Sequence, residues 1–104
     1  YQFILNELIS KTDAKITVLN IPYLASNKLL YFPFNSIYDF RIKQFNTAIL
    51  DTIKNSGRDD RIRLVDLYTN TYLLQKHDYD YYSSDLFHPS GDGYLIWNKI
   101  INAN

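Results

Sequence analysis

Residues 15–22 read Lys-Ile-Thr-Val-Leu-Asn-Ile-Pro, and this stretch decides the fold class. A short run that is rich in β-branched residues and apolar almost throughout predicts a strand over residues 15–21, ended by Pro22. Such runs are typical of parallel sheets, whose strands are covered by helices, so we expect this strand to be buried on both faces. Residues 61–67, which read Arg-Ile-Arg-Leu-Val-Asp-Leu, predict a second strand.

Helical patterns lie beside these two runs. One helix is predicted over residues 1–11, another over residues 37–55 and a third from Ser90 onward. Gly57 follows the second helix and can adopt the left-handed conformation that ends many helices. The apolar residues expected to face the core are Ile4, Leu5, Leu8 and Ile9 in the first helix, Ile37, Phe40, Phe45, Ala48, Ile49 and Ile53 in the second, and Leu95, Ile96, Trp97, Ile100 and Ile101 in the third.

The predicted order is helix, strand, helix, strand, connection, helix. Strands that alternate with helices predict an α/β unit with two parallel strands and flanking helices. Residues 23–36 form an irregular connection, and residues 68–84 form a long polar, tyrosine-rich one of the kind that often carries function. Two strands are few for a stable parallel sheet, so we expect further strands from an N-terminal portion or from a partner chain.

Length and composition limit the possible classes of protein. The 104 residues are 46% hydrophobic and 21% charged, which is typical of one small globular domain or of part of one. Eleven basic residues balance eleven acidic ones, so nucleic acid is not an expected partner. The sequence has no cysteine for a disulfide or a thiolate metal site, and no apolar run near the ~20 residues of a membrane span.

The residues suited to catalysis are concentrated in residues 84–94, which read Ser-Asp-Leu-Phe-His-Pro-Ser-Gly-Asp-Gly-Tyr. Serine hydrolysis needs a base that can take and return a proton, together with a carboxylate that orients the base. Asp85 and His88 are three residues apart and can supply both parts from one segment. Pro89 restricts the backbone of His88 to an extended conformation, and Ser90 can cap the helix that follows.

This segment resembles the last conserved block of the SGNH/GDSL hydrolases, where Asp-x-x-His-Pro precedes a small polar residue and a Gly-Tyr pair at the head of the final helix. The resemblance implies that Asp85 is the orienting acid and His88 the general base of a Ser-His-Asp triad. It also implies that the intact protein hydrolyses a carboxylic ester through an acyl-enzyme, without a metal or an organic cofactor. The substrate would be a lipid, an acetylated sugar or another small acyl ester.

Three other segments follow the family's order along the chain. Residues 16–22 resemble its strand that ends in Ile-Pro, Phe45 and Asn46 resemble the Phe-Asn of its next helix, and residues 65–68 resemble the strand that leads to its catalytic loop. The resemblance therefore covers nearly all of residues 1–104. It implies that they form the C-terminal part of a single domain with a flavodoxin-like, three-layer fold.

The nucleophile block of that family is absent from these residues. No serine lies in a Gly-Asp-Ser or Gly-x-Ser-x-Gly context, and the later Gly and Asn that complete the family's oxyanion hole are missing as well. Asp85 and His88 cannot catalyse by the triad mechanism without these groups. We therefore expect the chain to be one piece of a longer hydrolase, with the serine on a remaining N-terminal segment or on a partner chain.

Other interpretations of the same residues stay open. The scaffold could be a non-catalytic interaction module that binds through the aromatic connection at residues 68–84. A metal-dependent hydrolase could use His77 and His88 with nearby carboxylates, although their spacing matches no metal signature. The residues that could either help to form the site or serve the packing alone are Tyr23, Leu24, Asp66, Tyr79, Tyr81 and Tyr82.

Overall fold

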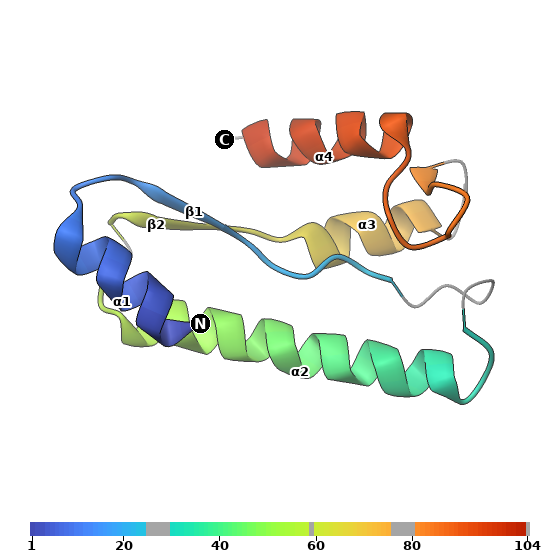
Figure 1. The fold of residues 1–104 in the computed structure, drawn as a ribbon, viewed down its shortest axis with the longest axis horizontal. Helices are drawn as coiled ribbons and strands as arrows, with labels where there is room; N and C mark the ends of the chain where they lie inside the picture. The colour runs from blue at the N-terminus through green and yellow to red at the C-terminus, as the bar shows by residue number, and fades with distance from the viewer. Residues whose placement is uncertain (25–29, 59, 76–80, 104) are drawn as a thin grey trace.

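Two short parallel strands form the centre of the molecule (Figure 1). In this computed structural model, which describes residues 1–24, 30–58, 60–75 and 81–103, β1 (Ile16–Leu19) pairs with β2 (Ile62–Val65). Ile16 lies opposite Ile62, and Leu19 lies opposite Val65. The predicted parallel pair is confirmed, although each strand is shorter than the range that its apolar run suggests.

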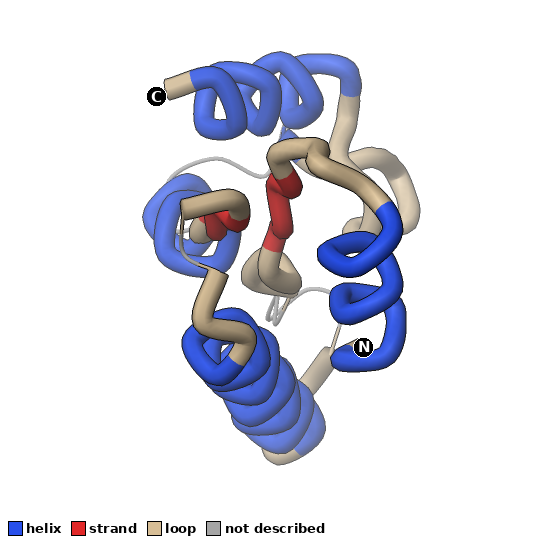
Figure 2. The backbone as a smooth tube through the Cα atoms, turned by 90° about the vertical axis from the view of Figure 1, so that its left-hand side faces the viewer, coloured by secondary structure: helices blue, strands red, loops and turns tan. Residues whose placement is uncertain are grey.

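Helices flank the strand pair on both sides. They are α1 (Gln2–Lys11), α2 (Phe34–Asn55), α3 (Leu67–Gln75) and α4 (Gly91–Asn102). In Figure 1, α1 and α2 lie below the strands and α4 lies above them, while α3 continues from the end of β2. Figure 2 shows the same arrangement from the side, with α2 and α4 at opposite ends of the view. The chain is thus a small mixed α/β structure.

The hydrophobic core lies between the strands and the first two helices. Its buried residues are Leu5, Val18, Ile49, Ile53 and Ile62, with Ile9, Ile16 and Leu64 packed against them. All three elements of the β1–α2–β2 unit contribute, as expected for side chains that repeat on one face of a strand and one stripe of a helix. This cluster fixes α1 and α2 against the same face of the sheet.

The opposite face of β1 is open, which corrects the prediction of a strand buried on both sides. Val18 is buried, but Thr17 and Leu19 are exposed. Among the described residues β1 pairs with β2 alone, so its second edge has no partner strand. A two-stranded sheet cannot cover the apolar residues that a wider sheet would bury.

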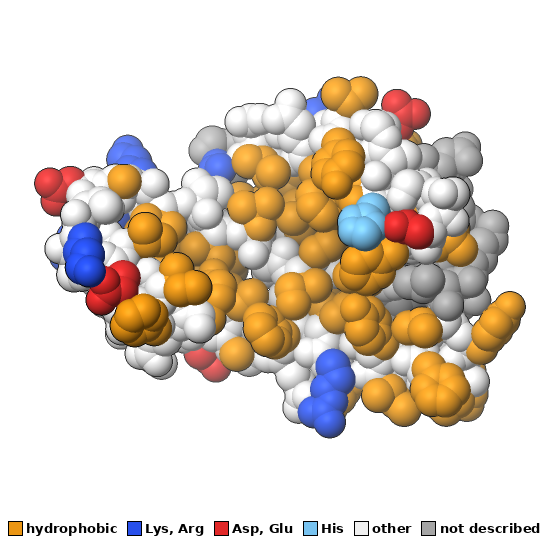
Figure 3. Space-filling view, in the orientation of Figure 1, with side chains coloured by type: hydrophobic (Ala, Val, Ile, Leu, Met, Phe, Trp, Pro, Cys, Tyr) orange, Lys and Arg blue, Asp and Glu red, His pale blue; other side chains and the backbone are white. Residues whose placement is uncertain are grey.

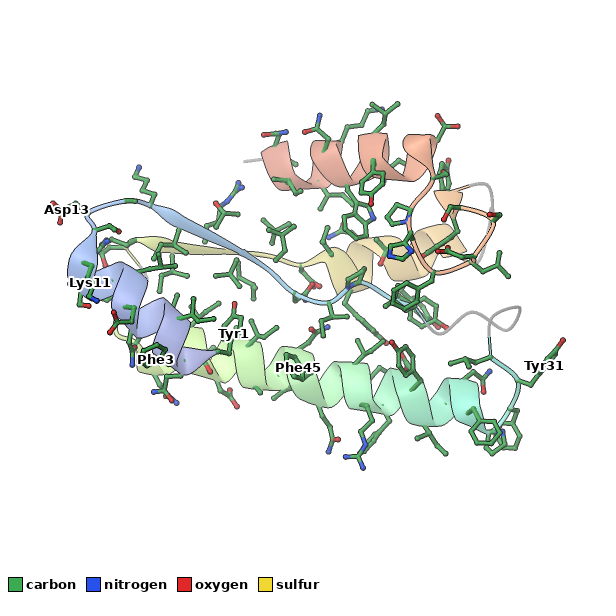
Figure 4. All side chains as sticks on the ribbon, viewed as in Figure 1. Tyr1, Phe3, Lys11, Asp13, Tyr31 and Phe45 are labelled. Carbon is green, nitrogen blue, oxygen red and sulfur yellow. The ribbon has the colours of Figure 1, made fainter. Side chains whose placement is uncertain are left out.

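Helix α2 differs from its predicted form in two respects. It begins at Phe34, where Pro33 occupies the N-cap, and not at residue 37. Its buried side is formed by Ile42, Ile49 and Ile53, whereas the other large apolar residues of the helix that were expected to face the core are exposed. These exposed residues are Ile37, Phe40 and Phe45, with Phe45 drawn on the visible side of α2 in Figure 4.

The prediction of a connection over residues 68–84 is wrong in its first part, where the structure has α3. Asp66 ends the strand and starts this helix, because its Oδ1 atom accepts a hydrogen bond from the backbone N–H of Thr69 at 3.1 Å. Leu67 and Thr71 then lie on the buried side, at 1% and 2% exposure. Residues 76–80 lie outside the described part of the chain.

A polar side chain on α2 holds the segment that leaves β1. The Asn46 amide accepts a hydrogen bond from the backbone N–H of Ile21 and donates one to its carbonyl oxygen, both at 2.8 Å. The side chain thereby replaces a neighbouring strand at the point where the sheet pairing stops. Asn46, the second residue of the Phe45-Asn46 pair, therefore has a structural function here.

Asn46→Ala is expected to lower the free energy of unfolding by about 1–3 kcal/mol, because two partly buried backbone groups of Ile21 lose their partner. Urea unfolding followed by circular dichroism measures the change. Gln44→Ala, at an exposed position of the same helix, is the control and should change stability by less than about 0.5 kcal/mol. Equal effects of the two substitutions would contradict a structural function of Asn46.

Candidate active site

The candidate site lies on a narrow hairpin-like loop before α4. Its two limbs run antiparallel: the backbone N–H of Ser83 donates to the carbonyl oxygen of His88 at 2.8 Å, and that of Ser90 donates to Tyr81 at 2.9 Å. Tyr82 and Pro89 form the bridge between these two hydrogen bonds. The limbs bring residues 84–87 to the tip, so Asp85 lies at the tip and His88 lies where the second limb begins.

The tip is closed by backbone hydrogen bonds and by the Asp85 side chain. The N–H of Leu86 donates to the Ser83 carbonyl oxygen at 2.9 Å, and Leu86 has a φ of 58°, in the left-handed region that turns use. Asp85 Oδ1 accepts hydrogen bonds from the backbone N–H groups of Phe87 and His88, each at 2.9 Å. An aspartate that caps the backbone ahead of it stabilises a turn locally.

The same carboxylate holds the imidazole of His88. Asp85 Oδ2 lies 2.6 Å from His88 Nδ1, a short hydrogen bond to a charged acceptor. The hydrogen bond with the His88 side chain, followed by those from the backbone, lowers the pKa of Asp85 well below its ordinary value. The carboxylate is therefore ionised at neutral pH. The structure thus brings together the two residues that the sequence predicts as catalytic.

The geometry leaves the second nitrogen of His88 available. Nδ1 donates to the ionised carboxylate, so the neutral ring carries its lone pair on Nε2. The His88 side chain is 65% exposed and that of Asp85 is 49% exposed. Among the described residues, the hydrogen bonds of the imidazole go to Asp85 alone. A base in this tautomer can accept a proton at Nε2 from a group that approaches from outside the hairpin.

No described serine occupies that position. The Ser83 hydroxyl lies 2.8 Å from Asp85 Oδ1 and 2.9 Å from the His88 carbonyl oxygen, on the carboxylate side of the pair. Ser90 caps α4, since its Oγ accepts the backbone N–H of Gly93 at 3.1 Å. The predicted cap is confirmed. In the described ranges, no hydrogen bond joins a serine to the imidazole of His88.

Helix α4 meets the first limb of the loop through a close contact. Gly93 is buried in the first turn, and a methyl group at its Cα would lie 2.2 Å from the Tyr81 carbonyl oxygen. Any side chain at this position would displace either the helix or the loop. Sequence reasoning assigned no separate function to Gly93, although the Gly-Tyr pair at the head of the helix was the available signal.

The tyrosines near the loop serve the packing. The Tyr82 hydroxyl donates to the carbonyl oxygen of Tyr23 at 3.1 Å, and the Tyr23 N–H donates to Thr71 at 2.9 Å. The Tyr23 ring packs edge-on against those of Tyr68 and Tyr72. Burial raises the pKa of Tyr82 to about 12. These contacts tie the first limb of the hairpin to the segment after β1 and to α3.

The other candidate residues lie apart from the Asp85–His88 pair. Asp66 accepts a hydrogen bond from Asn20 at 2.9 Å and caps α3, so it has a structural function at the ends of both strands. Leu24 is buried. Tyr79 and the predicted metal ligand His77 lie outside the described residues. Across the ranges that are described, no three His, Cys, Asp or Glu side chains come together as a metal site would require.

Hydrophobic side chains spread over the face of the molecule that Figure 3 shows, from the region of α1 across the strands. A histidine side chain with an acidic neighbour borders this apolar region, and His88 is the one histidine in the described residues. A groove of about 260 Å³ lies along α1 and β1. Its lining residues are Tyr1, Ile4, Leu5, Leu8, Ile16, Thr17, Val18 and Leu19.

No helix in the described part of the chain combines the length and the apolar character that crossing a membrane requires. Neither a family model, nor a curated protein, nor a solved structure matches this chain.

Proposed function

We propose that this chain supplies the histidine and the aspartate of the Ser-His-Asp triad in an ester hydrolase of the SGNH/GDSL type. The observation that carries the proposal is the 2.6 Å contact between Asp85 Oδ2 and His88 Nδ1, with the imidazole exposed on its other side. An ionised carboxylate that fixes the tautomer of an accessible histidine is the arrangement that activates a serine nucleophile. The proposed domain is the C-terminal part of a flavodoxin-like fold.

In the proposed reaction, His88 Nε2 takes the proton of a serine hydroxyl as the serine oxygen attacks the acyl carbonyl carbon. The ester C–O bond then breaks, and His88 returns the proton to the departing alcohol, which leaves an acyl-enzyme. Water, deprotonated by the same nitrogen, releases the acid and the free serine. Asp85 remains ionised and stabilises the imidazolium in both steps. This sequence of steps uses no metal or organic cofactor.

The serine and the oxyanion donors would come from an N-terminal segment of the same protein or from a partner chain. Two observations support a missing neighbour beside β1. The second edge of β1 has no partner strand in the described residues, and Leu19 on its open face is exposed. The apolar groove along α1 and β1 adjoins this edge. A further parallel strand would extend the sheet here and cover the apolar surface.

The substrate of the proposed hydrolase is a small carboxylic ester, such as a lipid or an acetylated sugar. A non-catalytic interaction module is the alternative, and one observation favours it. Tyr31 and Phe32 are 79% and 80% exposed at the end of the molecule where α2 begins, and Tyr31 points away from the body in Figure 4. Exposed aromatic side chains are frequent anchors of protein interfaces.

A fluorophosphonate probe distinguishes the two functions in the full-length protein that contains this chain. We expect the probe to label one serine, identified by peptide mass spectrometry, and short acyl esters to be hydrolysed. Heat-unfolded protein, in which the triad is dispersed, is the control and should not be labelled. Folded protein that shows neither labelling nor ester hydrolysis would refute the hydrolase proposal and support the interaction module.

A further inference from the structure

We propose that Ser83 is a positioning residue, whose hydroxyl aims the Asp85 carboxylate at His88. This inference rests on the proposed function, because it concerns the accuracy of the acid–base pair in ester hydrolysis. It starts from the position of the Ser83 hydroxyl, 2.8 Å from Asp85 Oδ1 and 2.9 Å from the carbonyl oxygen of His88. Ser83 therefore touches both members of the pair without touching the imidazole.

The single hydroxyl proton of Ser83 has two acceptors within reach, Asp85 Oδ1 and the His88 carbonyl oxygen, and it can be donated fully to only one of them. The His88 carbonyl oxygen already accepts the backbone N–H of Ser83 at 2.8 Å. Asp85 is ionised, and hydrogen bonds to a charged acceptor are roughly twice as strong as neutral ones. The hydroxyl proton therefore points to Asp85 Oδ1. Consistently, the Ser83 side chain is among the groups that lower the pKa of Asp85.

Ser83 restrains the carboxylate in a way that the other donors do not. Oδ1 also accepts the N–H groups of Phe87 and His88, and Oδ2 accepts from the His88 ring. All of these donors follow Asp85 within three residues, so they move with the tip of the loop. Ser83, two residues before Asp85, is the one described donor that reaches the carboxylate from the limb that leads into the tip. It thereby fixes the orientation of the carboxylate plane relative to the paired limbs of the hairpin, residues 81–83 and 88–90.

Loss of this hydroxyl is expected to affect turnover and not substrate binding. The carboxylate would keep its turn contacts but gain freedom to rotate, so that Oδ2 meets Nδ1 in fewer molecules. A displacement near 1 Å in catalytic geometry costs up to about 100-fold in rate, and we expect Ser83→Ala to lower kcat by about 10–100-fold. KM should stay within about twofold, because Ser83 makes no contact on the exposed side of His88.

The test compares three variants of the full-length protein. Ser83→Thr retains the hydroxyl and should restore kcat to within about threefold of the wild type. Ser84→Ala removes the exposed neighbouring serine and should behave as the wild type. Proton NMR supplies a second measurement that does not depend on activity. The downfield Nδ1–H resonance of His88 should persist in the wild type, Ser83→Thr and Ser84→Ala, and should broaden or move upfield in Ser83→Ala.

The outcomes separate this inference from the proposed function. A wild-type protein without esterase activity refutes the hydrolase, while the NMR comparison still decides whether Ser83 positions the pair. An active wild type with an unchanged kcat and an unchanged Nδ1–H signal in Ser83→Ala overturns the inference and leaves the hydrolase standing. Failure of Ser83→Thr to restore either quantity, in a variant whose unfolding midpoint matches the wild type, overturns it as well.

Discussion

Asp85→Asn is expected to lower kcat for ester hydrolysis by about 10⁴-fold while the hairpin keeps its shape. The two carboxylate oxygens of Asp85 have separate functions. Oδ1 accepts three hydrogen bonds that close the turn, and Oδ2 accepts the Nδ1–H of His88. Asparagine retains the first set with its carbonyl oxygen. Its amide group would face Nδ1 as a donor, so the ring would carry its proton on Nε2 and could not accept one from serine.

Steady-state kinetics of the full-length protein measure this effect, and Asp85→Ala provides the comparison. Alanine removes the turn contacts as well, so its unfolding midpoint should fall below that of Asp85→Asn. Asp92→Asn, which makes the same chemical change at an exposed position in the first turn of α4, is the matched control. A kcat for Asp85→Asn near that of Asp92→Asn would show that the Asp85–His88 contact is structural.

The low pKa of Asp85 sets the sign of the pH dependence of this contact. The hydrogen bond with His88 is the largest cause of the shift, and it favours the ionised carboxylate. A carboxylate whose pKa is lower in the folded state stabilises that state above its ordinary pKa of ~3.9 and loses this contribution as the pH falls further. The Asp85 carboxylate therefore stays ionised throughout the neutral and mildly acidic range.

His88→Ala is expected to reduce kcat by at least about 10⁴-fold, because it removes the proposed general base of the triad. The fold should survive, since the His88 ring is exposed and its hydrogen bond goes to Asp85. Loss of fluorophosphonate labelling and of ester hydrolysis would be measured together. His77→Ala replaces the other histidine of the chain and is the control. Loss of activity in both variants, reversed by added zinc, would instead support a metal-dependent hydrolase.

The β1–α2–β2 unit could be predicted from the sequence because its signals are local. The strand patterns at residues 15–21 and 61–67 and the helical pattern between them specify strands and a helix without reference to distant residues. Gly57 indeed has a φ of 66°, as its place after α2 predicts. The extent of burial could not be predicted in this way. The open face of β1 depends on which strands and helices are present beside it, and the buried stripe of α2 depends on which apolar residues meet the sheet.

Helix α3 was missed because its beginning resembles the end of a strand. Val65 and Leu67 extend the apolar residues of the strand pattern past Asp66, and the residues that follow have no strong helical pattern. The structure uses Asp66 as a cap for Thr69 and as a partner of Asn20, which lies 46 residues away in the sequence. A contact over that distance is decided by the packing of the two strand ends, which a local pattern does not describe.

In the candidate site, too, some residues could be predicted from the local sequence and others could not. Asp85 and His88 could be predicted as a pair because the turn that joins them is formed by their own backbone. The supporting residues could not, because their contacts depend on how the loop folds back on itself and on how separate segments pack together. Ser83 reaches Asp85 from the limb that leads into the tip, and Tyr82 reaches Tyr23 beyond β1.

Because glycine has no side chain, Gly93 lets α4 pack directly against the hairpin that carries Asp85 and His88. The first turn of α4 meets the Tyr81 carbonyl group so closely that not even a methyl group fits between them. The backbone of α4 at Gly93 therefore packs directly against the backbone of the hairpin at Tyr81, with no flexible side chain between them. Movement of the Tyr81 carbonyl group toward α4 is opposed by the backbone in the first turn of this 12-residue helix. In the proposed hydrolase, this support would help to hold His88 in position for a nucleophile on another part of the protein.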